Sequence, residues 1–161
     1  MNGALLHSYR ISKYDPKYRV DGIYTRDEWT SMSDIGRTYN GQVVTRDEYD
    51  RVETAYLSVV KKLCLLLDID EIQLTGLEDY FNNCTHCNGA ILMGADTIIK
   101  VVQDCLREEY WCQLIAPKLE IHFGYDYYLY VCCSLEFEQV NRLALDVGLF
   151  VEVKELPTYD V

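Results

Sequence analysis

The sequence contains no apolar run long enough to cross a membrane and no leader-like start. None of its apolar stretches approaches the roughly 20 residues that a membrane-spanning helix needs. The opening residues, MNGALLHSYR, lack the basic n-region, apolar h-region and small-residue cleavage site of a signal peptide. The chain also has no internal repeat and no low-complexity segment. We therefore expect a cytoplasmic protein that makes no contact with a membrane.

The chain also lacks the common motifs of catalysis and of phosphate binding. It has no G-x-G-x-x-G, no G-x-x-x-x-G-K-[ST] and no H-E-x-x-H. Its three histidines are His7, His86 and His122, and none stands in a recognisable arrangement with a cysteine or a serine. We therefore expect a protein that is not an enzyme and needs no cofactor.

What the sequence does contain is typical of a globular domain. Apolar residues make up 49% of the 161 residues and charged residues 25%, which excludes an intrinsically disordered chain. A chain of this length buries a core without disulfides or metals, so we expect one domain over residues 1–161. Seven cysteines cannot all pair within the chain, and a reducing compartment keeps them as thiols.

The clearest predicted element is a helix that begins at Thr45 and runs to about residue 67. Thr45 and Glu48 form a capping box, and apolar residues recur behind them at helical spacing. Earlier in the chain, the stretch TRDEWTSMSDIG predicts a shorter helical turn, capped by Thr25 and Glu28.

The rest of the chain predicts two more helices and a sheet. Helical spacing predicts a second helix at about 95–111 and a third between a Ser134 cap and a Gly148 stop. Apolar and polar residues alternate at about 4–14, 119–123, 127–133 and 149–156, which we expect to be strands, and the middle two form a hairpin. The stretch EIQLTGLEDY predicts a further short strand that runs into a loop. The expected fold is α+β: a mixed or mainly antiparallel sheet with about three helices packed against it.

The charge of the chain is strongly negative overall but positive at the front. The formal net charge is −11 at pH 7, although residues 1–26 carry five bases and only two acids. The basic stretch SYRISKYDPKYR either binds phosphate groups or forms an edge strand and turn paired with acids elsewhere. We favour the second reading, because a small basic patch on an acidic domain binds polyanions weakly. We therefore expect four bases to pair with acids elsewhere in the fold: Arg10, Lys13, Lys17 and Arg19.

The motif CTHC offers an alternative, metal or thiol chemistry. Cys84 and Cys87 have the spacing of two zinc ligands, but a structural zinc site needs four. The other close pair, Cys132 and Cys133, lies on a predicted strand, where neighbouring side chains point to opposite faces. A thioredoxin-like role needs the motif at a helix start, whereas here it falls in a loop. A loop thiol pair without metal is the reading we favour.

Acids and tyrosines occur side by side along much of the chain. It has 14 tyrosines, and a tyrosine combines a large contact area, few rotamers and a hydrogen-bonding tip, as interface cores require. Neighbouring acids steer a basic partner and fix its register. The candidate partner-binding residues lie in a predicted hairpin loop and at a predicted helix end: Asp126, Tyr127 and Tyr128, with Glu108, Glu109 and Tyr110.

Part of the chain also resembles a known class of proteins. YRISKYDPKYR, DEWTSMSDIG and TRDEYDRVETAYLSVVKKL, within roughly the first 65 residues, resemble immunity proteins of bacterial polymorphic toxins, in particular those of contact-dependent growth inhibition systems. The resemblance implies a cytoplasmic, non-enzymatic protein that binds a toxin's C-terminal domain and blocks its active site. Such toxins are often nucleases with basic clefts. No family-wide set of binding residues can be carried over to this chain.

Three functional hypotheses follow. The leading one is a monomeric immunity protein that neutralises a cognate, basic toxin domain and does not itself bind nucleic acid. The second is a generic acidic adaptor domain that binds some other basic protein. The third is a small zinc or thiol protein that uses Cys84 and Cys87.

Overall fold

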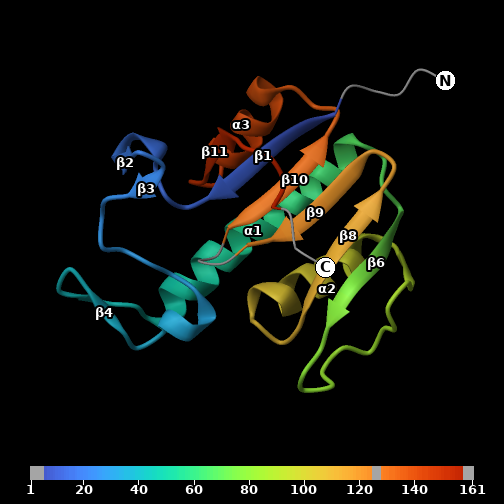
Figure 1. Cartoon of the computed structure of the whole chain (residues 1–161), viewed down its shortest axis with the longest axis horizontal. Coiled ribbons are helices and arrows are strands. Elements are labelled where there is room, and N and C mark those ends of the chain that lie inside the picture. Colours follow the sequence, from blue (N-terminus) through green and yellow to red (C-terminus); the bar gives the residue numbers. More distant parts are fainter. Residues whose placement is uncertain (1–5, 125–127, 158–161) are drawn as a thin grey trace.

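Seven antiparallel strands form the main sheet of the protein (Figure 1). The computed structural model describes residues 6–124 and 128–157. The strands lie side by side in the order β11, β1, β10, β9, β8, β6, β7. In that order their bounds are Phe150–Val153, His7–Ser12, Leu129–Cys133, Leu119–Phe123, Trp111–Ala116, Glu71–Glu78 and Ile91–Met93.

Three helices pack on one face of this sheet. They are α1 (Arg46–Leu66), α2 (Ala95–Leu106) and α3 (Phe137–Leu145). α1 crosses behind the sheet in Figure 1 and contacts both α2 and α3. The expected α+β fold, with three helices on an antiparallel sheet, is confirmed. Over the residues that the structure describes, we find no helix that is both long and apolar enough to cross a bilayer.

Two short hairpins and two 3₁₀ turns complete the fold. The hairpins pair β2 (Arg19–Val20) with β3 (Ile23–Tyr24), and β4 (Thr38–Tyr39) with β5 (Gln42–Val43). The 3₁₀ turns cover Pro16–Tyr18 and Met32–Asp34. All four lie in the segment that joins β1 to α1.

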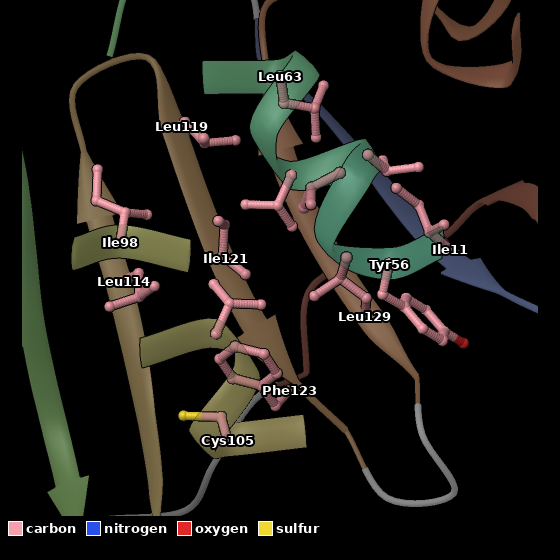
Figure 2. Packing of buried hydrophobic residues seen from close by; sticks show 14 of the residues in the cluster. Ile11, Tyr56, Leu63, Ile98, Cys105, Leu114, Leu119, Ile121, Phe123 and Leu129 are labelled. Carbon is pink, nitrogen blue, oxygen red and sulfur yellow. The ribbon is translucent and has the colours of Figure 1, made fainter. Parts of the chain in front are cut away.

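The core lies between the helices and the sheet, as Figure 2 shows. Tyr56 and Leu63 of α1 and Ile98 of α2 face strand residues such as Leu114 and Ile121, and all five side chains are fully buried. Burying each such side chain contributes about 1.5–3 kcal/mol to folding. The helical and alternating patterns of the sequence therefore identified the two faces that form the core.

The first helix begins at its predicted cap. The Thr45 side chain accepts a hydrogen bond from the backbone N–H of Glu48 at 3.1 Å, which satisfies one of the free donors of the first turn. The Glu48 carboxylate pairs with Lys13 and Arg51. The residue types at this helix start therefore serve both the helix and its contact with the chain's basic front.

Two predicted boundaries are wrong. The second helix was expected to reach residue 111, but α2 ends at Leu106 and Trp111 begins β8. A turn in between breaks the helical period, and from Cys112 onward every second residue is buried. α3 starts at Phe137 and not next to Ser134, because Glu136 and Gln139 form its capping box.

The predicted helical turn at Thr25 is also wrong. The Thr25 hydroxyl donates to the carbonyl of Tyr18, which ties it to the β2–β3 hairpin. The helical turn forms six residues later, at Met32–Asp34. Ser31, which precedes it, donates from its backbone N–H and from its hydroxyl to the Asp34 carboxylate, at 2.9 and 2.7 Å.

The bases of SYRISKYDPKYR are paired with acids, which confirms one half of the second reading; its other half, an edge strand, is wrong. Arg10 and Arg19 both pair with Glu152, at 2.9 and 3.0 Å. Lys13 pairs with Glu48 at 3.3 Å, and Lys17 pairs with Asp15 at 3.2 Å. The strand itself is not an edge strand, because β1 lies between β11 and β10. The four bases are therefore engaged within the fold, and the uncompensated charge of the chain is acidic.

Candidate functional site

A groove of about 620 Å³ lies at one end of the main sheet. One wall is the segment between β3 and β5, which contributes Trp29, Asp34, Arg37 and Tyr39. The strand ends and the hairpin after β9 contribute Trp111, Phe123 and Tyr128. The groove is therefore assembled from segments that lie far apart in the sequence.

The opposite wall comes from the end of β6 and from the turn between α2 and β8. It contributes Glu78, Tyr80, Phe81, Glu108, Glu109 and Tyr110. Among the described lining residues, four carboxylates face a single guanidinium, that of Arg37. Eight of the other lining residues are aromatic. An acidic groove with aromatic walls suits cations and cationic side chains, which are attracted both by carboxylates and by ring faces.

Two of the carboxylates connect the walls to neighbouring segments. The Ser33 hydroxyl donates to Glu108 Oε1 at 3.4 Å, across the groove. The Asn83 side-chain amide donates to Glu109 Oε2 at 2.8 Å. Both donors are neutral, and both glutamates are exposed. Glu108 and Glu109 thus keep their charge available to a partner.

Asp34 has a structural role in the same groove. Its carboxylate accepts from the Ser31 backbone at 2.9 Å and from the Tyr39 hydroxyl at 2.6 Å. The bond to Asp34 raises the pKa of the Tyr39 hydroxyl. These contacts tie the 3₁₀ turn to the β4–β5 hairpin and fix the wall that carries Arg37.

A β-bulge near the end of β6 bends this strand toward the groove. The pairing of β6 with β8 shifts register between Thr75 and Glu78, and Gly76 adopts a left-handed backbone with φ of 60°. An added Cβ at Gly76 would lie 3.7 Å from the Trp111 ring. A bulge bends its strand and redirects the side chains that follow. Here the redirected residues are Glu78 and the loop that carries Tyr80 and Phe81.

The backbone of Glu108 is held in an unfavourable conformation. It has φ of 61°, in the left-handed region that favours glycine. Glu108 donates its N–H to the Cys105 carbonyl, and Glu109 donates to the Asp104 carbonyl, the two bonds of a Schellman helix end. Gly148 takes the equivalent position after α3, and Asp68 takes it after α1. α2 therefore ends with a glutamate where glycine is the unstrained choice.

Replacing Glu108 by glycine is expected to stabilise the fold. The free energy of unfolding should rise by about 0.5–1 kcal/mol, because relief of the left-handed strain exceeds the added freedom of glycine in the unfolded chain. Asp68→Gly should give a smaller gain, since aspartate tolerates this conformation better than glutamate. Urea unfolding of both variants measures the difference. A loss of stability in Glu108→Gly would contradict the assignment of strain.

The structure places four of the six predicted partner-binding residues in this groove. Glu108, Glu109, Tyr110 and Tyr128 all line it, whereas Asp126 and Tyr127 lie outside the described residues. The first three lie just past the end of α2 at Leu106, in the turn that closes this helix and leads into β8.

Tyr110 and Tyr128 differ in their surroundings. Tyr110 is buried, and its hydroxyl donates to Asp104 at 3.1 Å; burial and this carboxylate raise its pKa. Tyr128 is half-buried, with the Arg10 and Arg19 guanidinium carbons 4.6 and 5.3 Å from its ring centre. Tyr110 therefore anchors the turn to α2, while Tyr128 joins the groove to the basic front of the chain.

Sequence reasoning missed the wall formed by Trp29, Arg37 and Tyr39. A signal was present in the dipeptide that follows Tyr39: Asn40 and Gly41 both have positive φ and form the β4–β5 turn. Tyr80 and Phe81 were also missed, because a loop sequence does not reveal which side chains it exposes.

The cysteines show no metal-like gathering. Cys84 is half-buried and Cys87 exposed, and the Asp79 carboxylate accepts from the Cys84 backbone at 2.9 Å. Among residues 6–124 and 128–157, no group of three or more histidine, cysteine or acidic side chains could hold a metal ion. The Cys105 and Cys112 sulfurs lie 3.5 Å apart, and this contact and burial raise the pKa of Cys105. That thiol is protonated and unreactive at neutral pH.

The candidate site rests on the geometry and charge of the groove. Comparison with protein-family models, with curated proteins and with solved structures found no match.

Proposed function

We propose that this chain is an immunity protein that neutralises a cationic toxin domain by binding it in the acidic, aromatic groove. The observation that carries the proposal is the composition of the groove: four carboxylates, one guanidinium and several aromatic rings around about 620 Å³. Aromatic residues supply contact area at interfaces, and carboxylates supply steering and register. The resemblance of the first 65 residues to immunity proteins points to the same class of partner.

The charges favour a cationic partner over a polyanion. Four of the five bases at the front of the chain are paired with Glu152, Glu48 and Asp15, which disfavours a phosphate-binding patch there. The chain as a whole carries a net charge of −11. A nuclease domain is the toxin class that this charge suits best, because carboxylates can occupy the positions of substrate phosphates in its cleft. The protein acts as a monomer in the cytoplasm and catalyses no reaction.

Co-expression tests the proposal against a generic adaptor role. Candidate toxin domains encoded in the genome that carries this chain are expressed in cells, each with and without this chain. We expect growth to be restored for one cationic toxin domain, and restored growth to be lost with the double variant Glu108→Lys and Glu109→Lys. Circular dichroism checks that this variant folds. Restored growth that is unaffected by the charge reversal would contradict the groove as the binding site.

The adaptor hypothesis predicts a different result. A generic acidic adaptor binds a resident basic protein and protects against none of the toxin domains. Failure of protection across all of these domains would overturn the immunity function.

A further inference from the structure

Two neighbouring aromatic side chains at the rim of the groove are unusually exposed. Tyr80 is 86% exposed and Phe81 is 75% exposed, more than any other large hydrophobic side chain in the described residues. Single exposed apolar residues are normal on protein surfaces, but two adjacent aromatic rings form a patch. Aromatic side chains of this kind dominate the binding energy of protein interfaces.

The loop that carries them is held by hydrogen bonds at its base. The Asp79 carboxylate accepts from the backbone N–H groups of Asn83 and Cys84, both at 2.9 Å. The Asn83 side chain reaches Glu109 across the loop at 2.8 Å, and the half-buried Cys84 packs against the core. The rings are therefore presented on a fixed scaffold, which lowers the entropy lost on binding.

We propose that Tyr80 and Phe81 are an anchor that inserts into an apolar recess on the cationic partner. This inference rests on the proposed function. It adds a protruding part to the same interface, formed by Tyr80 and Phe81 at the rim of the groove. Glu78 lines the groove beside the two rings, and Glu109 is hydrogen-bonded to their loop. The recess must therefore be bordered by lysine or arginine side chains that meet these two carboxylates.

The same charges argue against a second copy of this chain as the occupant. A symmetric contact through Tyr80 and Phe81 would bring the Glu78 and Glu109 carboxylates of two copies together. Two chains with a net charge of −11 also repel each other at long range. A cationic partner relieves both conflicts.

The test measures binding of the toxin domain against which the chain protects cells. Tyr80→Ala with Phe81→Ala should weaken the affinity by about 100-fold or more, through a faster dissociation rate. The matched control is Val20→Ala with Ile23→Ala, which removes two exposed apolar side chains of the β2–β3 hairpin that do not line the groove. The control should change the affinity by no more than about twofold. Urea midpoints should stay close to wild type for both double variants.

The salt dependence of association separates the role of the Tyr80 and Phe81 anchor from that of the groove carboxylates. Loss of the anchor should leave the salt dependence of association unchanged, whereas Glu108→Lys with Glu109→Lys should reduce it. Weak binding only in the charge variant would overturn the anchor and leave the proposed function standing. If none of the cationic toxin domains binds, both fall. NMR order parameters below 0.6 for the backbone of residues 79–84 would also contradict a preorganised anchor.

Discussion

Arg107→Ala is expected to lower the free energy of unfolding by about 3–5 kcal/mol. Arg107, just after α2, donates from Nε and Nη2 to the Glu53 carboxylate of α1, at 2.6 and 2.9 Å. Tyr49 and Gln103 donate to the same carboxylate at 3.2 and 3.4 Å. The Glu53 side chain is only 5% exposed, so removal of Arg107 leaves a buried carboxylate with neutral partners.

The matched control for this loss is an exposed ion pair on α1, the helix that carries Glu53. Arg46 pairs with Asp50 at 2.9 Å, and both side chains are about half exposed. Arg46→Ala should cost only about 0.5 kcal/mol or less, because surface pairs are screened by water and salt. Urea unfolding of the two variants at pH 7 measures the contrast. Equal losses would show that burial of Glu53 does not determine the effect.

An apolar replacement of the whole pair sharpens the test. Glu53→Met with Arg107→Leu removes both charges, so it should recover much of the stability that Arg107→Ala loses. The pair joins α1 to the residue that precedes Glu108. We therefore expect this double variant to keep the fold while it loosens the groove turn.

Raising the pH from 10 to 11 is expected to lower the free energy of unfolding, by about 1 kcal/mol for each buried hydroxyl or thiol that keeps its proton in the folded chain. Burial raises the pKa of Tyr56 far above its ordinary value and that of Cys64 to about 11. The pKa of Cys105 is raised by the contact of its thiol with Cys112 and by burial. In the folded chain these groups keep their protons above pH 10, whereas in the unfolded chain they release them. The unfolded state then binds fewer protons, so stability falls as pH rises.

Tyr56→Phe separates this effect from general alkaline damage. The stability that depends on these groups is fully present below about pH 8. It is lost as pH rises past the unfolded pKa values, first for the two cysteines and then for Tyr56. Removing the Tyr56 hydroxyl should reduce the loss between pH 10 and 11 by about 1 kcal/mol. Tyr80→Phe is the control, because its side chain is 86% exposed in the folded protein. Equal pH profiles for both variants would contradict the role of the buried hydroxyl.

The periodic part of the fold could be predicted from the sequence, and the irregular part could not. The apolar residues of α1 and of the strand pair β9 and β10 repeat at 3.6 and 2 residues, because one face of each element meets the core. The strand β8 was missed because its start, Trp111, follows a helix without a glycine or proline between them. The left-handed backbone of Glu108 breaks the helix there instead.

The two short hairpins were readable but were overlooked. Asp21 with Gly22 and Asn40 with Gly41 adopt positive φ at both positions, as the tight turns of hairpins require. The groove itself was beyond sequence reasoning, since it joins residues from Trp29 to Tyr128 through strand pairings of the whole sheet. The acid and tyrosine pattern nevertheless indicated Glu108, Glu109 and Tyr128, which the fold brings into one groove.

The most direct test of the account compares the toxin affinity of Glu108→Gly with that of Asp68→Gly. Each variant removes one negative charge from the left-handed position at a helix end, but only Glu108 lines the groove. We predict that Glu108→Gly binds the toxin domain about tenfold or more weakly although its fold is more stable, while Asp68→Gly binds like wild type. Equal affinities for the two variants would contradict the central claim that the groove carboxylates recognise a cationic partner.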